Sequence, residues 1–290
     1  MVAGGVKPPV ACNMRSSLEI YDLATETARV VLQSDGLIEA PNWDPTGAGF
    51  LVNSGGRLYR VPADAPRLIL IDTGDLVRCN NDHAFSRDGG QILFGCHRGH
   101  GAELFAMPAL GGAARLISPQ PPTWLHGLAP DGSGMVYGAA RGDKSVIDIY
   151  TKTWDGPETR LTFGQGMCDG PDFAADGRAI YYNCDRSGSA QIWVMNADGS
   201  DQRQLFADDH VNWFPHPSPD GAHLLYLAYP PGTAGHPRDL PVALCLCNPD
   251  GGNRRRILEF TGGQGSLNVP NWSPDGHAFA YVRYSQPQEP

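Results

Sequence analysis

The sequence predicts an all-β protein, a six-bladed β-propeller with four-stranded antiparallel blades, and three observations support this prediction. Six related segments start 42, 43, 45, 44 and 55 residues apart along the 290-residue chain, a spacing typical of propeller blades. Short runs of aromatic and β-branched residues fill the intervals. The 36 glycines and 25 prolines provide for many tight turns. The segments are PNWDPTG (41–47), HAFSRDG (83–89), HGLAPDG (126–132), PDFAADG (171–177), PHPSPDG (215–221) and PNWSPDG (270–276).

Each repeat predicts the same four strands in the same order. A short first strand ends at the segment, where Asp and Gly residues form a tight turn. A second strand follows, for example QILFGC (91–96), and then a third, for example QIWVMN (191–196). A glycine hairpin such as DGS (198–200) leads to a fourth strand such as RQLF (203–206). One repeat therefore supplies one blade.

The two ends of the chain predict how the ring closes. The N-terminal part begins with two strands and no turn segment, whereas the last turn segment is followed by a single strand. We expect both ends to share the sixth blade, because this pairing leaves no open sheet edge in the ring and is compatible with a monomer. The predicted boundaries are 1–16 for an N-terminal extension, 17–34 plus 266–284 for the sixth blade, and 1–290 for a single domain.

Charge and composition exclude several classes of partner. The formal net charge is −9 and the one basic run, at 254–256, is short, so we expect no nucleic-acid partner. No apolar run is long enough to cross a membrane, and we expect no membrane partner. The N-terminus lacks the apolar region of a secretory signal, which favours the cytoplasm, or the periplasm if a signal has been removed. The seven cysteines are irregularly spaced, and we expect all of them to be reduced.

The repeat resembles a known family. The segment PNWSPDG (270–276), the strands between the segments and the DGG hairpin (250–252) are similar to the WD-repeat-like propeller units of the TolB family, and this likeness covers nearly the whole chain. The same architecture is distantly similar to that of the cytosolic oligogalacturonate lyases. The resemblance implies the six-bladed fold. It also implies two kinds of function, a metal-assisted lyase with histidines on one propeller face or a partner of envelope proteins.

Departures from the repeat indicate where a functional site lies. Four of the six segments begin with proline, but two begin with His83 and His126. Other polar or aromatic departures lie just before or inside the first strands, which line the central channel of a propeller: Glu39, Asn81, Asp82, Trp124, Asp169, Asn212, His216 and Asn268. The loops after the second strands should open on the same face. They carry His97, His100, His236, Arg238 and Asp239.

Imidazoles beside carboxylates are typical of metal ligands or of general acid–base pairs. By resemblance to the lyases, a divalent metal (manganese, zinc or calcium) would be bound by His83, His126 and His216, with Asp169 or Asn212 assisting. The predicted catalytic residues are His126, Asp169 and Arg238. The predicted substrate-binding residues are Glu39, Asn81, His97, His100, Trp124, Trp213, His236 and Asn268.

Two functions from different classes fit these residues. The favoured one is a protein that binds or acts on a small saccharide or uronate. If it is an enzyme, its reaction would be a metal-assisted elimination of the lyase type. Trp124, Trp213 and Phe214 would then offer aromatic faces to a sugar ring. The alternative is a non-catalytic scaffold that binds a protein or peptide. A polar pocket with perturbed titratable groups favours the saccharide function, and a shallow face with dispersed histidines favours the scaffold.

Overall fold

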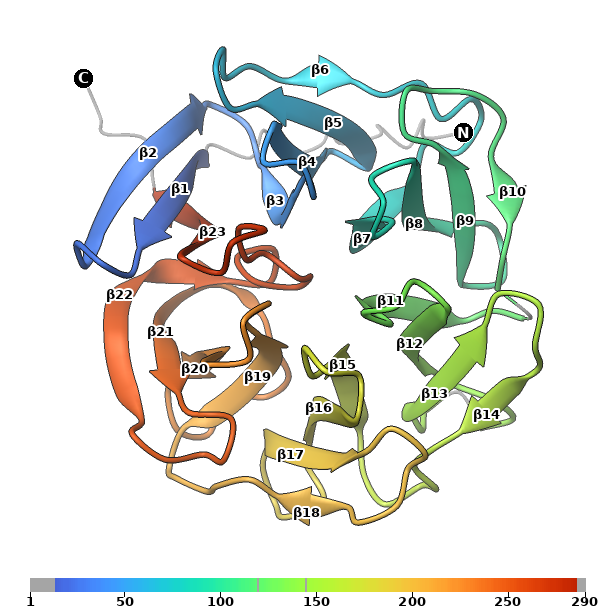
Figure 1. Ribbon diagram of the computed structural model, residues 1–290, viewed down its shortest axis with the longest axis vertical. Helices are drawn as coiled ribbons and strands as arrows, with labels where there is room; N and C mark the ends of the chain where they lie inside the picture. The colour runs from blue at the N-terminus through green and yellow to red at the C-terminus, as the bar shows by residue number, and fades with distance from the viewer. Residues whose placement is uncertain (1–13, 119, 144, 286–290) are drawn as a thin grey trace, which may run out of the picture.

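The computed structural model shows six β-sheets arranged as blades around a central axis (Figure 1). It describes residues 14–118, 120–143 and 145–285. Five of the sheets have four strands and one has three, and the strands in each sheet run antiparallel. The prediction of a six-bladed propeller is confirmed. Within the described residues, no helix is long and apolar enough to cross a membrane.

Blades one to five each consist of four strands that are consecutive in the sequence. Within a blade, the first strand lies nearest the central axis and the fourth lies at the outside of the ring. Blade one contains β3 (Glu39–Trp43), β4 (Gly49–Ser54), β5 (Arg57–Pro62) and β6 (Ile69–Leu70). Blade two contains β7 (Cys79–Phe85), β8 (Gln91–His97), β9 (Ala102–Pro108) and β10 (Arg115–Leu116). Blade three contains β11 (Thr123–Leu128), β12 (Gly134–Ala139), β13 (Asp148–Thr153) and β14 (Glu158–Arg160). Blade four contains β15 (Cys168–Phe173), β16 (Ala179–Cys184), β17 (Gln191–Asn196) and β18 (Arg203–Gln204). Blade five contains β19 (Val211–Pro217), β20 (Leu224–Tyr229), β21 (Arg238–Cys247) and β22 (Arg255–Gly263).

Blade six joins the two ends of the chain, as the sequence predicts. Its sheet has the order β2 (Thr27–Ser34), β1 (Arg15–Asp22) and β23 (Ala278–Ser285). The innermost position is occupied by the segment before β23, which pairs through one isolated bridge between Trp272 and Phe279 instead of a full strand. The closure is nevertheless continuous, because β1 and β23 pair over their whole lengths.

The inner strand of each of the first five blades contains a register shift. The shift lies between Glu39 and Asn42 in β3, Cys79 and His83 in β7, Leu125 and Gly127 in β11, Asp169 and Asp172 in β15, and Trp213 and His216 in β19. Residues within such a bulge leave the regular ladder, and their side chains are re-aimed. Two of them, Ala40 and Phe214, take the left-handed conformation with φ of 54°. The bulges therefore direct selected side chains towards the axis of the ring.

The hydrophobic core lies between neighbouring blades. In the closing blade, fully buried Leu18 packs in a cluster that also contains Phe50 and Val61 of blade one. Similar clusters join each blade to the next, as the alternating side chains of packed sheets require. The ring is thus held together by apolar contacts across every blade boundary.

Replacing Leu18 should show how much the closing blade contributes to stability. Leu18→Ala is expected to lower the free energy of unfolding by about 2–5 kcal/mol, because it leaves a cavity at a fully buried position. Val30→Ala in the neighbouring strand is the matched control and should change it by less than about 0.5 kcal/mol, since Val30 is 51% exposed. Urea denaturation measures both. Equal effects of the two substitutions would contradict the packing described.

Candidate functional site

The candidate site lies at the end of the ring where the inner strands begin, which we call the His126 end. Bulged residues of blades two and three, together with Asp169 just before the bulge of blade four, meet the segment 264–268 and the residues just before β21 there. We call the polar residues that converge there the channel cluster. It comprises Asp82, His126, Asp169, His236, Gln264 and Asn268.

His126 is buried between two blades and the segment before β23. Its Nε2 lies 3.1 Å from Asp169 Oδ1, and its Nδ1 lies 3.2 Å from the carbonyl oxygen of Asn268. Burial opposes a charge on the ring, but the carboxylates of Asp169 and Asp82 outweigh it and raise the pKa of His126 to about 9. The ring is therefore an imidazolium at neutral pH.

The two carboxylates near His126 differ in their protonation. Burial raises the pKa of Asp82 to about 7, and the charge of His126 only partly offsets this increase. Burial also acts on Asp169, but the adjacent His126 outweighs it and holds the pKa of Asp169 below its ordinary value. The site thus combines a cation, a firm anion and a carboxyl group that titrates near neutral pH.

Several buried polar atoms at this end lack a hydrogen-bond partner among the described residues. They are Asn81 Oδ1, His126 Nε2, Asp169 Oδ1, Trp213 Nε1 and Tyr229 Oη. His126 Nε2 and Asp169 Oδ1 are close enough for an ion pair, yet their alignment is too poor for a hydrogen bond. Buried polar atoms without partners are costly and rare in native proteins. Their concentration here favours a site for a polar molecule.

An aromatic group borders the channel cluster. The ring of His236 lies edge-on to Trp213, with centroids 4.4 Å apart, and to Phe214, with centroids 5.0 Å apart. His236 Nδ1 also hydrogen-bonds Gln264 Oε1. Burial lowers the pKa of His236, so this ring is neutral where that of His126 is charged. Trp213 and Phe214, predicted as faces for a sugar ring, are both buried and contact His236.

A second group of predicted residues lies beside the cluster. Asn81 Nδ2 donates to Glu39 Oε1 at 3.2 Å, and Arg238 Nη1 lies 3.9 Å from the same oxygen. Arg238 is also paired with Asp239 at 3.3 Å. Burial raises the pKa of Glu39. The structure therefore joins Glu39, Asn81 and Arg238, but it already surrounds the guanidinium with carboxylates.

The structure does not bring the three predicted metal ligands together. His83 Nε2 lies 2.7 Å from the carbonyl oxygen of Ala40 in the neighbouring blade, and burial lowers the pKa of His83 to about 4. His216 is fully buried, with its Nδ1 3.0 Å from Asp172 and its Nε2 3.3 Å from the carbonyl oxygen of Leu267. In the parts of the chain that the structure describes, no group of three or more His, Cys, Asp or Glu side chains is arranged to hold a metal.

Three further predicted residues stand apart from the channel cluster. His97 and His100 are exposed at the end of β8 and in the loop that follows it. Trp124 is partly buried on β11, where it pairs with Gly138 of β12. Their predicted contacts with a substrate stay predictions.

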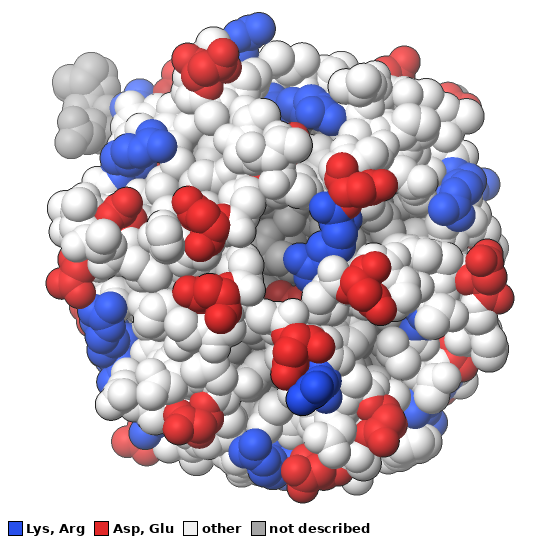
Figure 2. All heavy atoms as spheres, in the orientation of Figure 1, with Lys and Arg blue, Asp and Glu red and all other residues white. Residues whose placement is uncertain are grey.

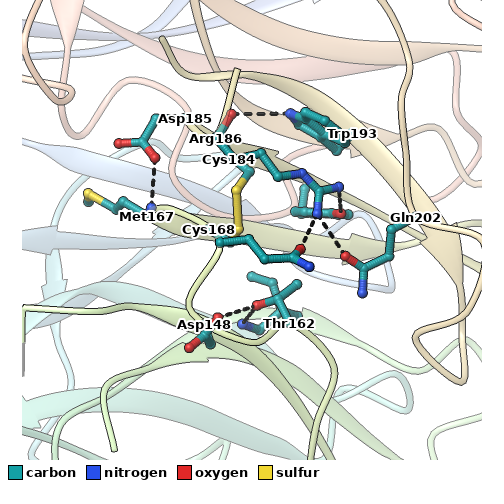
Figure 3. Close-up of a disulfide and its surroundings, with 12 residues drawn as sticks. Asp148, Thr162, Met167, Cys168, Cys184, Asp185, Arg186, Trp193 and Gln202 are labelled. Carbon is teal, nitrogen blue, oxygen red and sulfur yellow. Dashed lines mark hydrogen bonds between the residues drawn. A yellow bond between two sulfur atoms is a disulfide. The ribbon is translucent and has the colours of Figure 1, made fainter. Parts of the chain in front are cut away.

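The expectation that all seven cysteines are reduced is wrong, because Cys168 and Cys184 form a disulfide (Figure 3). The two residues are direct partners across β15 and β16. Cys168 immediately precedes Asp169, so the bond anchors the strand at the site carboxylate. In the described residues the free thiols belong to Cys79, Cys96, Cys245 and Cys247, all buried.

Two contributors to the site were not among the predicted site residues. Gln264 accepts a hydrogen bond from Asn268 Nδ2 at 3.1 Å as well as contacting His236. Gly138 makes room for Asp169, since a Cβ at this position would lie 2.4 Å from Asp169 Oδ1. The first lies in the glycine-rich run 261–265. No local pattern pointed to the second, because the contact crosses between blades.

The fold and site together define a closed six-bladed propeller with a buried His–Asp cluster at one end. A family model described as "PD40: TolB beta propeller domain" matches residues 119–236. An uncharacterized protein of Agrobacterium fabrum is 44% identical over 275 residues, which cover 94% of this chain and 93% of the relative. The chain belongs to the TolB-like PD40 β-propeller family.

Two solved structures show the range of similar proteins. One is "putative TolB from Agrobacterium tumefaciens", which is 43% identical with a TM-score of 0.91 and covers 94% of this chain and 99% of its own. The other is an oligogalacturonate lyase in complex with manganese, 12% identical with a TM-score of 0.54, covering 84% of this chain and 67% of its own. The second likeness concerns the fold alone.

The raised pKa of His126 predicts a pH-dependent stability. An NMR titration of the histidine signals should give His126 a pKa of about 9. In Asp169→Asn the pKa of His126 should fall below the ordinary 6.5, because the effect of burial is no longer outweighed by the carboxylate of Asp169. The ion pair stabilises the fold fully below pH 6.5, and this stabilisation is lost as the pH rises through about 9. The stability advantage of the wild type over Asp169→Asn should shrink over that interval. A constant difference would contradict the pairing.

Gly138 provides a test of how Asp169 is positioned. Gly138→Ala should displace the carboxylate and lower the pKa of His126 by about one unit or more, since the added Cβ overlaps Asp169 Oδ1. Gly36→Ala is the control, because its Cβ would come no nearer than 3.7 Å to Ser34 Oγ. The same NMR titration reads out both variants. An unchanged His126 pKa in Gly138→Ala would show that Asp169 does not depend on this space.

Proposed function

We propose that the chain binds a small neutral saccharide at the His126 end and that the channel cluster exchanges protons with it. The observation that carries the proposal is the set of buried polar atoms at the His126 end that lack a hydrogen bond to the described residues, namely Asn81 Oδ1, Trp213 Nε1 and Tyr229 Oη, beside the His126–Asp169 ion pair. A ligand that supplies both donors and acceptors would satisfy them. Hydroxyl groups do both, and a saccharide presents several in a small volume.

The buried polar atoms at this end, including the two of the His126–Asp169 pair, match a polyhydroxylated ligand in kind. Trp213 Nε1, Tyr229 Oη and the imidazolium Nε2 of His126 are donors. Asn81 Oδ1 and Asp169 Oδ1 are acceptors. A purely anionic or purely cationic group would leave part of this set unsatisfied. The mixture favours hydroxyl groups over a single charged group.

The charges around the site favour a neutral saccharide over a uronate. Carboxylates outnumber cations there, because Glu39, Asp82, Asp169 and Asp239 face only His126 and Arg238 as charged partners. A uronate carboxylate would add a further negative charge. Manganese is bound by the distantly similar oligogalacturonate lyase, but the predicted ligands of this chain do not converge on one point. We therefore propose no step that uses a metal.

The channel cluster also has the parts of a general acid–base site. His126 is protonated at neutral pH and can donate through Nε2. Asp82, with a pKa of about 7, is partly ionised under the same conditions and can accept or return a proton. Asp169 keeps His126 charged and in place. His126 and Asp82 would thus act as an acid and a base towards the hydroxyl groups of the bound saccharide.

Ligand titrations by NMR would test the binding site. Neutral monosaccharides and disaccharides should shift the indole signal of Trp213, and galacturonate should bind more weakly because of the carboxylates around His126. Asp169→Asn and Asp82→Asn should each weaken binding by about tenfold, as the loss of one hydrogen bond to a charged group implies. Asp209→Asn, at an exposed position, is the matched control and should bind like the wild type.

Two results would contradict the proposal. Binding that is unchanged in Asp169→Asn and Asp82→Asn would place the ligand elsewhere. Indole shifts confined to Trp43 and Trp272 would place it at the opposite end of the ring, where these two residues lie.

That opposite end supports a second function, binding of a protein or peptide. A cavity of about 350 Å³ opens there between the turn segments of all six blades, lined by rings such as Trp43, Phe85 and Trp272 and by several prolines. Figure 2 shows an opening at the centre of one face with acidic side chains around it. The exposed aspartates of the turns are Asp88, Asp131, Asp176, Asp220 and Asp275. Arg87 also lines the cavity, and basic side chains reach into the opening in Figure 2, so the acidic rim, rather than the cavity itself, would attract a basic segment of a partner.

A further inference from the structure

Blades two and four carry cysteine pairs at the same place in the repeat. Cys79 and Cys96 are direct partners across β7 and β8, as Cys168 and Cys184 are across β15 and β16. In each pair, one cysteine begins the inner strand and the other lies at or next to the end of the second strand. Only the pair in blade four is bonded in the structure.

The hydrogen bonds around the two pairs are equivalent. In blade two, the amide of His97 donates to the carbonyl oxygen of Arg78, and in blade four the amide of Asp185 donates to that of Met167. These bonds flank each cysteine pair, which therefore occupies a non-hydrogen-bonded site of the antiparallel ladder. The inner cysteine donates its own amide to the preceding blade in both cases, Cys79 to Gly56 and Cys168 to Ile147.

This site of a ladder is compatible with a disulfide. Residues opposite each other at non-hydrogen-bonded sites have Cα atoms about 4.5 Å apart, near the lower end of the range that disulfides span. The bonded pair in blade four has a Cα–Cα distance of 4.1 Å. Cys79 and Cys96 lie opposite each other in the same kind of ladder position as the bonded pair. Both are buried, with 5% and 1% of their surface exposed.

We propose that Cys79 and Cys96 form a second disulfide, equivalent to the one in blade four. Two S–H bonds are broken and one S–S bond is formed, while two protons and two electrons pass to an exchanging disulfide such as oxidised glutathione, which leaves as two thiols. The reaction proceeds through a mixed disulfide on one of the cysteines. Because both thiols are buried and the pKa of Cys79 is raised to about 12, the exchange takes place during folding or when blade two opens.

The second bond would act on the candidate site. The register of β7 moves from the pair Cys79–Cys96 to the pair His83–Phe94, and residues 80–82 leave the ladder between them. Asp82 belongs to this bulge. A bond at the first pair fixes the start of the bulge, just as Cys168–Cys184 fixes the strand at Asp169. Both carboxylates that act on His126 would then lie on strands held by disulfides.

Refolding in a glutathione buffer would test the proposal on the full chain. A Cys12→Ser background removes the thiol that lies outside the described residues. After equilibration, free thiols are trapped with N-ethylmaleimide, and the peptides are mapped by mass spectrometry without reduction. We expect cross-linked peptides for Cys79–Cys96 and for Cys168–Cys184, with Cys245 and Cys247 alkylated. The proposal is overturned if Cys79 and Cys96 are both alkylated in protein that contains the Cys168–Cys184 bond, or if Cys79 pairs with another cysteine.

A second measurement covers the case in which substitution harms folding. The oxidised parent protein should unfold at a higher temperature than Cys79→Ser/Cys96→Ser, and this difference should become smaller once both are reduced with phosphine, leaving only the packing cost of the two buried serines. Cys245→Ser/Cys247→Ser is the matched control, because it also removes two buried thiols. Its difference in unfolding temperature from the parent protein should be the same before and after reduction. A difference of the same size before and after reduction would assign the whole effect to packing and overturn the disulfide.

Discussion

The candidate site depends on the register shifts in the inner strands. A regular strand alternates its side chains between two faces, and in a propeller both faces are covered by neighbouring blades. The shift between Cys79 and His83 takes Asp82 out of the ladder, whereas Asp169 precedes the shift in β15 and still pairs with Asn183. The charges of both carboxylates act on His126. Phe214, which lies in the bulge of β19, takes the left-handed conformation with φ of 54°, so this bulge also carries backbone strain. Without these bulges, the polar side chains would be forced into apolar layers between blades.

Burial of charge explains why the cluster has its composition. A lone imidazolium in the interior would lose its proton, as His83 shows with a pKa of about 4. His126 keeps its proton because two carboxylates share its surroundings. Burial is the main cause of the raised pKa of Asp82, and the charge of Asp169 adds to it, whereas for Asp169 the adjacent His126 outweighs burial and lowers the pKa. The graded pKa values therefore follow from burial of both acids together with the close pairing of one of them, Asp169, with the cation.

The sequence predicts the fold better than the site, and the reason is the range of the interactions. Asp-Gly turns and strand patterns are local, and they defined all six blades and the closing pair of ends. His83 and His126 have identical positions in the repeat, so the sequence gives no reason to separate them. Their difference arises from partners across blade boundaries, such as Asn268, which is 142 residues from His126. The disulfide was missed for the same reason, since it requires the register of β15 and β16.

The two ends of the ring differ in how strongly their side chains are needed to hold the blades together. At the turn end, the residues that build each turn also form the rim, because exposed aspartates such as Asp88 and Asp220 accept hydrogen bonds from the turn's own amides. Changing them would weaken a blade. At the His126 end, the bulged residues make few ladder bonds, so their side chains can vary while the blade is kept. Chemistry specific to this chain is therefore expected at the His126 end, whereas the turn end carries what the repeat itself imposes.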